Sequence, residues 1–146
     1  MNPAAVHLAL NNFPPILDFA ALLVLAAGLF WRSRAVVRAA LVLFVLAALI
    51  AIPVFLTGQR SEAIVKDLEG VNATAIQPHE EAADWAIWLL AAQGVIALAV
   101  LLMFRTREFA RWTLIAIVIV AAFATMAAFR TAYLGGHIHH PETQMN

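Results

Sequence analysis

The second apolar stretch of the chain decides its fold. Residues Ala35–Thr57 read AVVRAALVLFVLAALIAIPVFLT, and their one charged residue, Arg38, lies near the start. A helix needs about 20 mainly apolar residues to cross the hydrocarbon core of a bilayer. This stretch therefore predicts a membrane-spanning helix. Pro53 lies near its end and predicts a kink, which membrane helices tolerate.

Three other stretches have the same character, namely Phe13–Trp31, Trp85–Phe104 and Trp112–Leu134. The 146 residues are 64% hydrophobic and 12% charged, whereas a soluble domain is about half apolar and about a quarter charged. The excess apolar surface has to face lipid. The sequence predicts an all-α four-helix transmembrane bundle, one domain over residues 1–146, made of two tandem helical hairpins joined by a loop over residues 58–84.

Arginines flank both short connections between the predicted spans. They are Arg32, Arg34 and Arg38 at the first connection and Arg105, Arg107 and Arg111 at the second. The long loop is acidic. Because positive residues stay on the cytoplasmic side, both termini and the long loop should lie on the extracytoplasmic side of a bacterial inner membrane. No Lys or Arg precedes the first apolar stretch, which predicts that this span inserts uncleaved.

All five histidines fall at the same predicted end of the bundle. His7 and His79 precede the first and third spans, and His137, His139 and His140 follow the fourth. Imidazole is the commonest ligand for zinc, copper, nickel and haem iron. The chain has no cysteine, which excludes disulfides, iron–sulfur clusters, thiolate zinc sites and covalent c-type haem. The histidines therefore predict a haem or metal site at the outer face.

The first functional interpretation is a small membrane cytochrome with a b-type haem. Two of His7, His79 and His140 would ligate the iron, and Arg60, Arg130 and Tyr133 are the nearest candidates for contacts with its propionates. Low-spin haem needs two axial imidazoles on opposite faces. Such a protein would pass electrons from quinol or a membrane oxidoreductase to a periplasmic acceptor, or serve a larger membrane complex.

Two other interpretations stay open. A copper, zinc or iron ion could bind His7, His79, His137, His139 or His140, with Glu80, Glu81 or Glu142 completing the site; this would suit metal handling or a small metalloenzyme. The chain could instead be a structural subunit without a cofactor. Whether it is an enzyme or forms a homodimer stays open. Its net charge of zero gives no argument for nucleic acid.

Two charges lie inside predicted spans, Asp18 in the first and Arg130 in the fourth, at matching depths. Unpaired charges in a membrane cost a few kcal/mol, so we expect these two to form an ion pair that braces the spans. The alternatives assign Arg130 to a haem propionate or Asp18 to proton relay. Gly135-Gly136 predicts the end of the last helix, and would also let backbone approach a flat macrocycle.

The two arginine clusters indicate a weak internal repeat. Arg32-x-Arg34-x-x-x-Arg38 and Arg105-x-Arg107-x-x-x-Arg111 have the same spacing. Sliding one hairpin onto the other places His7 opposite Glu80, one residue from His79. A tandem repeat about an axis along the membrane normal would bring His7 and His79 to matching places on opposite sides of the bundle.

Three short motifs resemble a known family, and they are His7 to Pro14, His79 to Ala83 and Tyr133 to Glu142. Together they resemble an uncharacterised family of small four-span bacterial membrane proteins, a predicted-membrane-protein domain of unknown function that is similar in layout to the small b-type cytochromes. The resemblance spans the whole chain. It implies histidines at the positions of His7, His79 and His140. The family often has a further histidine where this chain has Asn12, so the chain departs from the pattern there.

Overall fold

The computed structural model describes residues 2–66, 70–105 and 108–139. Within these ranges the chain is helical and contains no strand. The helices are α1 (Pro3–Leu10), α2 (Phe13–Phe30), α3 (Arg34–Val65), the short 3-10 helix η1 (Ala73–Ala75), α4 (Ile76–Met103) and α5 (Arg111–His139). The prediction of an all-α fold with four long apolar helices is confirmed.

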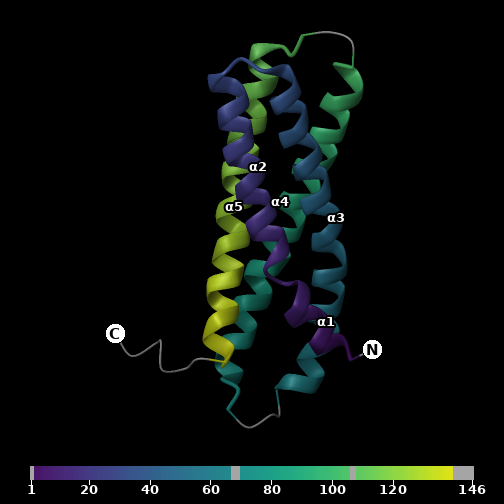
Figure 1. Ribbon diagram of the computed structural model, residues 1–146. Coiled ribbons are helices and arrows are strands. Elements are labelled where there is room, and N and C mark those ends of the chain that lie inside the picture. The colour runs from purple at the N-terminus through teal and green to yellow at the C-terminus, as the bar shows by residue number, and fades with distance from the viewer. Residues whose placement is uncertain (1, 67–69, 106–107, 140–146) are drawn as a thin grey trace, which may run out of the picture.

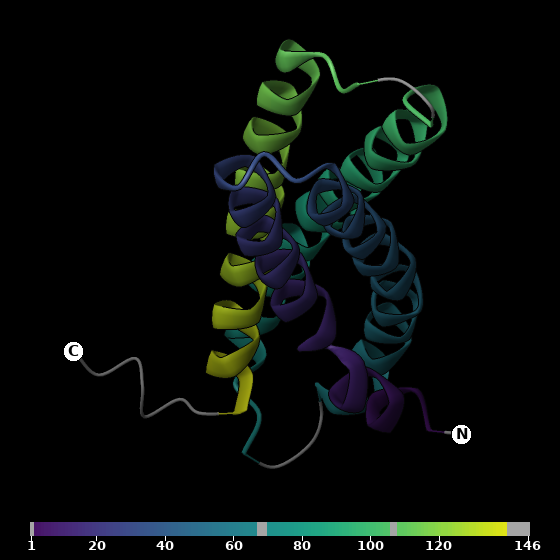
Figure 2. The same cartoon turned by 45° about the horizontal axis from the view of Figure 1, so that its top comes forward.

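Helices α2, α3, α4 and α5 form the bundle (Figure 1). The four helices are arranged in a closed ring: α2 packs against α3, α3 against α4, α4 against α5 and α5 against α2. Helix α1 packs against the C-terminal part of α3 (Figure 2). The C-terminus of α5 lies at this same end of the bundle (Figure 1). We call this the histidine end. The opposite end, with the connections α2–α3 and α4–α5, is the arginine end.

Four helical segments are long and apolar enough to cross a membrane, as a multi-pass membrane protein requires. They are Pro3–Phe30, Arg34–Glu62, Ala73–Met103 and Arg111–Ile138. Large apolar side chains cover the outside of the bundle: Trp88 is 74% exposed, Val95 68% and Met126 61%. A soluble monomer rarely exposes so large an apolar area, whereas lipid chains would cover it.

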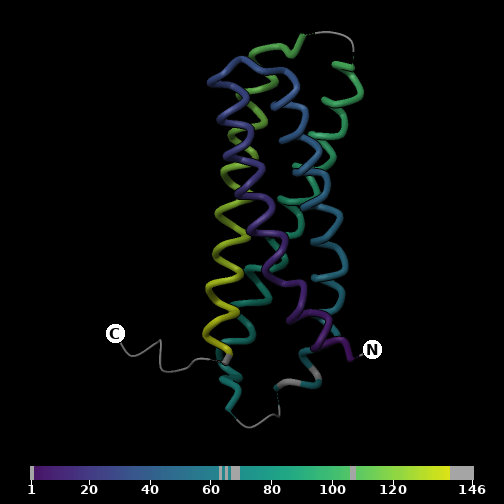
Figure 3. The backbone as a smooth tube through the Cα atoms, in the orientation of Figure 1, coloured from purple at the N-terminus to yellow at the C-terminus, as the bar shows by residue number. Residues whose placement is uncertain are grey.

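The first membrane-length segment is broken in two. Helix α1 ends at Leu10, and the chain turns at Asn11 and Asn12 before α2 begins (Figure 3). Pro14 and Pro15 lie in the first turn of α2, where a missing backbone N–H costs nothing. The same two prolines would prevent α1 from continuing. The break gives α1 its own direction and lets it lie against α3.

The helices extend beyond the predicted spans at the histidine end. Helix α3 continues past Thr57 to Val65 and α4 begins at Ile76, so the connection is much shorter than the predicted loop over residues 58–84. The prediction that Gly135-Gly136 ends the last helix is wrong, because α5 continues to His139. Apolar composition marks the part of a helix inside lipid, and polar residues can continue the same helix into water.

The core changes in character along the bundle. Toward the arginine end, large side chains such as Leu25, Leu41, Phe44 and Ile117 are at most 2% exposed. Toward the histidine end, a smaller cluster consists of three alanines and Leu90. Small residues allow close helix approach in membranes. Large side chains therefore fill the interior toward the arginine end, whereas Ala51, Leu90 and Ala128 of the smaller cluster also line a cavity at the histidine end.

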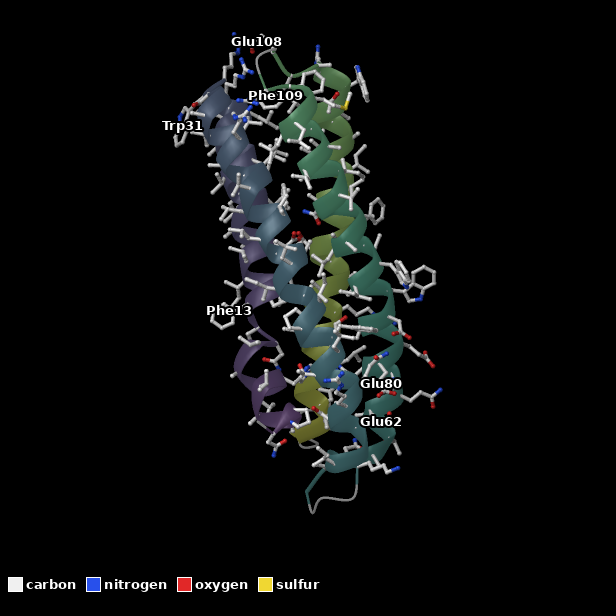
Figure 4. All side chains as sticks on the ribbon, turned by 90° about the vertical axis from the view of Figure 1, so that its right-hand side faces the viewer. Phe13, Trp31, Glu62, Glu80, Glu108 and Phe109 are labelled. Atoms are coloured by element: carbon white, nitrogen blue, oxygen red, sulfur yellow. The ribbon has the colours of Figure 1, made fainter. Side chains whose placement is uncertain are left out.

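Arginine side chains join the two hairpins at the arginine end. The Arg34 guanidinium donates to the carbonyl oxygens of Phe104 (2.7 Å) and Arg105 (3.2 Å), and Arg38 donates to Phe104 (3.3 Å). Phe104 follows the last residue of α4. These bonds satisfy carbonyls that the helix leaves free and place positive charge at the negative end of its dipole. Figure 4 shows Glu108 and Phe109 at this end.

We expect Phe44→Ala to destabilise the bundle by roughly 2 kcal/mol, somewhat less than in a soluble core because lipid also solvates the exposed ring. Phe44 is 1% exposed, whereas Phe123 is 56% exposed. Phe123→Ala is therefore the matched control and should change stability little. The measurement is reversible unfolding in mixed micelles. Equal losses for both variants would contradict the packing described here.

Candidate cofactor site at the histidine end

His7 is held against α3 by one hydrogen bond and one close contact. Its Nδ1 lies 2.9 Å from the carbonyl oxygen of Val54. A carbonyl only accepts, so Nδ1 carries the proton and donates it. The ring also lies on Gly58: a Cβ atom at that position would be 2.9 Å from the His7 Cε1 atom. Only glycine fits there without displacing the imidazole.

His79 is held against α5 in the same way. Its Nδ1 lies 2.9 Å from the carbonyl oxygen of Thr131 and therefore donates to it. A Cβ atom at Gly135 would be 3.0 Å from the His79 Cε1 atom and 3.2 Å from Nδ1. Gly135 thus provides room for an imidazole inside a continuous helix. This is the physical reason why a glycine stands there without ending α5.

The two histidine environments are copies of one another. Each Nδ1–H donates to a carbonyl that lies four residues before the glycine on which the ring rests. The broken pair α1 and α2 therefore corresponds to α4, and α3 corresponds to α5. The internal repeat predicted from the arginines is supported at these positions. The arginine alignment placed His7 opposite Glu80, whereas the structure matches His7 with His79 itself.

The two imidazoles face the same region, with ring centroids 6.5 Å apart and ring planes at 83°. Because each Nδ1 is protonated, each Nε2 has its lone pair free to bind a ligand. A metal ion binds an imidazole nitrogen at about 2.0–2.1 Å. Two rings on opposite sides of one ion would therefore have centroids about 6.3 Å apart, whereas the tetrahedral angle that zinc prefers would bring them to about 5.2 Å. The observed separation of 6.5 Å is close to the value for two rings on opposite sides of one ion and longer than the tetrahedral value.

A cavity of about 590 Å³ adjoins the two histidines. Its wall comes from α1, α2, α3, α4 and α5 and is mostly apolar, and its volume falls within the range of roughly 300–1,000 Å³ that is usual for ligand and cofactor sites. Three carboxyl side chains also line it: Glu62, Glu80 and Asp84. Glu62 and Glu80 come from neighbouring helices and lie at the same end in Figure 4, close enough for their carboxyl groups to interact.

The described part of the chain holds a pair of histidines and not a larger ligand cluster. No group of three or more His, Asp or Glu side chains with metal-binding geometry exists within the described residues. Glu80 lines the cavity without joining the pair. Glu81 is exposed and accepts a hydrogen bond from Gln77.

The C-terminal candidates lie elsewhere. The rings of Tyr133 and His137 contact each other, with centroids 4.4 Å apart. Tyr133 is 66% exposed, and neither residue lines the cavity. His139 ends α5. The side chain of His139, together with His140 and Glu142, lies outside what the structure describes.

The predicted arginine contacts do not reach the cavity either. Arg60 and Arg130 are exposed and absent from its lining. The predicted ion pair between Asp18 and Arg130 is wrong: Asp18 is fully buried and accepts a hydrogen bond from the Thr125 hydroxyl at 2.6 Å. Arg130 lies five positions after Thr125, about 140° around the helix, so it points away from the core that contains Asp18.

Sequence reasoning found the histidine pair but not what holds it. The carbonyls of Val54 and Thr131 carry no sequence signal, because every residue has a carbonyl. Gly58 does carry a sequence signal for the histidine contact: it directly follows the second apolar stretch, as Gly135 follows the fourth. Comparison with known proteins finds no family model, no curated protein and no solved structure that matches the chain.

We expect Gly135→Ala to displace the His79 ring and break its bond to Thr131. Gly136→Ala is the control, because a Cβ there meets no atom within 4 Å. Both changes should favour the helix by about 1 kcal/mol, so only the contact with His79 distinguishes them. Side-chain ¹⁵N NMR measures the result: the His79 Nδ1–H signal should shift in Gly135→Ala and persist in Gly136→Ala. An unchanged signal in both would contradict this geometry.

Proposed function

We propose that the protein is a small membrane redox protein in which His7 and His79 are the two axial ligands of one b-type haem. The separation of 6.5 Å between their ring centroids carries the proposal. His7 and His79 would hold the iron through their Nε2 atoms, which carry no proton when Nδ1 donates to a carbonyl. When bound, such a haem supplies one-electron transfer.

The residues around the two imidazoles support the same function. The carbonyls of Val54 and Thr131 accept the Nδ1 protons, which fixes the ring orientation and makes each Nε2 a better donor. The apolar cavity wall would exclude water from a flat hydrophobic cofactor. Each ligand comes from a different hairpin, so the assembled bundle fixes their separation.

Location and partners follow from the charges. The positive-inside rule puts the arginine end in the cytoplasm, and the histidine end then faces the extracytoplasmic side of a bacterial inner membrane. The electron partners would be a membrane oxidoreductase or quinol on one side and a periplasmic acceptor on the other, or a larger membrane complex.

A bound metal ion is the second candidate. The carboxyl groups of Glu62, Glu80 and Asp84 line the same cavity, and carboxylates suit a cation better than they suit the negatively charged propionates of haem. An ion such as copper, zinc or iron would take two ligands from His7 and His79. The carboxyl groups do not form a ligand group with this pair, so its further oxygen ligands would be water molecules, and the carboxylates would balance its charge.

Absorption spectra of the purified protein, oxidised and dithionite-reduced, with elemental analysis of the same sample, test the proposal. We expect a Soret band with sharpened visible bands on reduction. His7→Ala and His79→Ala should each abolish the low-spin spectrum, because each removes one axial ligand. His137→Ala should retain it, since His137 contacts Tyr133 instead.

The other outcomes are equally clear. Stoichiometric copper, zinc or iron without a Soret band, lost in His79→Ala, would replace the haem by the metal ion. A protein expressed with added haem that carries neither haem nor metal would overturn both candidates and leave a structural subunit. A haem spectrum that survives in the double variant His7→Ala, His79→Ala would place the ligands elsewhere.

A further inference from the structure

A second polar site lies deeper in the bundle than the histidines. Asp18 on α2 is fully buried, and its Oδ2 accepts the Thr125 hydroxyl of α5 at 2.6 Å. Its other oxygen, Oδ1, has no hydrogen-bond partner among the described residues. Burying a polar atom without a partner costs about 1–3 kcal/mol. A carboxyl group kept there at such a cost needs an explanation.

Gln93 on α4 completes this site. It is 2% exposed, and neither its amide nitrogen nor its amide oxygen has a partner in the described part of the chain. Gln93 lies beside the Asp18 carboxyl without a hydrogen bond to it, and Thr125 donates one; both neighbours are uncharged. The one ion pair among the described residues joins Arg34 to Glu108 at the arginine end. We call Asp18, Gln93 and Thr125 the Asp18 cluster.

The chemistry of the Asp18 cluster suits a proton. An amide group has both a donor and an acceptor, so Gln93 can serve either state of the carboxyl. It accepts from Oδ1–H through Oε1 when Asp18 is a carboxylic acid, and it donates from Nε2 when Asp18 is a carboxylate. Thr125 can donate to Oδ2 in both states. One proton can therefore be gained or lost with only a turn of the Gln93 amide.

The Asp18 cluster lies close to the cavity. Pro15, Leu90 and Ala128 line the cavity, and each lies three positions from one member of the cluster on the same helix. Three residues of helix rise about 4.5 Å, so one layer of side chains separates the two. Toward the arginine end, the cluster is instead covered by the large residues of the main core, with Leu25, Leu41 and Phe44 at most 1% exposed.

The geometry points to a proton-binding site inside the membrane-spanning part of the bundle, in which Asp18 exchanges one proton with the water of the histidine-end cavity. A proton from the cavity joins the Asp18 carboxylate at Oδ1 and gives the acid, and the reverse step returns it to the same side. The residues of the Asp18 cluster are distinct from His7 and His79, so the proton site is tested on protein without bound haem or metal, in which water can enter the cavity.

Infrared difference spectroscopy of the whole protein in lipid vesicles tests this inference. The wild-type spectrum minus the Asp18→Asn spectrum should show the carbonyl stretch of one carboxylic acid. The band should shift in D₂O and disappear as the pH is raised. Asp84→Asn is the control: it removes a carboxyl from the cavity wall and should leave this band in place.

Gln93→Leu gives a second measurement that keeps Asp18 and does not depend on the folding of Asp18→Asn. Loss of the amide partner should move the acid band to higher frequency. Three results would overturn the inference. They are identical wild-type and Asp18→Asn spectra at every pH, a band that responds neither to pH nor to D₂O, and a band abolished by sodium but not by choline at constant pH. The last result would mean a metal-cation site.

Discussion

Inside a bilayer, every backbone N–H and C=O group has to find its partner within the protein. The four long helices meet this requirement by themselves, and the rest of the structure depends on how they do so. Where α1 and α2 are interrupted, prolines supply two residues that have no N–H to satisfy. Where α4 ends, two arginines of the other hairpin donate to the carbonyl of Phe104, the residue that follows the helix. The helices therefore provide both the scaffold and, through two of their carbonyls, the anchors of the histidine pair.

Those two anchors explain why both imidazoles have a defined orientation. Val54 and Thr131 belong to long helices, so their positions are fixed by the whole bundle. The hydrogen bond to such a carbonyl fixes the orientation of each imidazole. The glycine four residues later lets the ring lie close to the helix backbone. Asp18 has no such backbone anchor, because its neighbours are side chains that can rotate. One end of the molecule therefore holds two rings in fixed places, while its interior holds a carboxyl group with adaptable neighbours.

The sequence predicted the spans, the hairpins and the meeting of His7 with His79, because apolar length and connectivity determine which helix ends come together. It did not predict the side chains that face one another in the core. Asp18 and Arg130 match in depth, but depth ignores the rotation of a helix, and Arg130 points outward. The internal repeat was also hard to align from the sequence. Gly58 lies 20 positions after Arg38, whereas Gly135 lies 24 positions after Arg111. That difference is about one helical turn, so corresponding glycines do not align when the arginines do.

The matched surroundings of the two histidines also bear on ancestry. Each hairpin contributes one imidazole, one acceptor carbonyl and one glycine, so neither hairpin alone can present two rings to each other. A half-length ancestor with a single hairpin could have built this pair only by associating with a second copy of itself. Fusion of two such copies would remove the dependence on concentration and free each half to diverge. The break between α1 and α2, which α4 lacks, and Asp18, which α4 does not repeat, are what such divergence would leave.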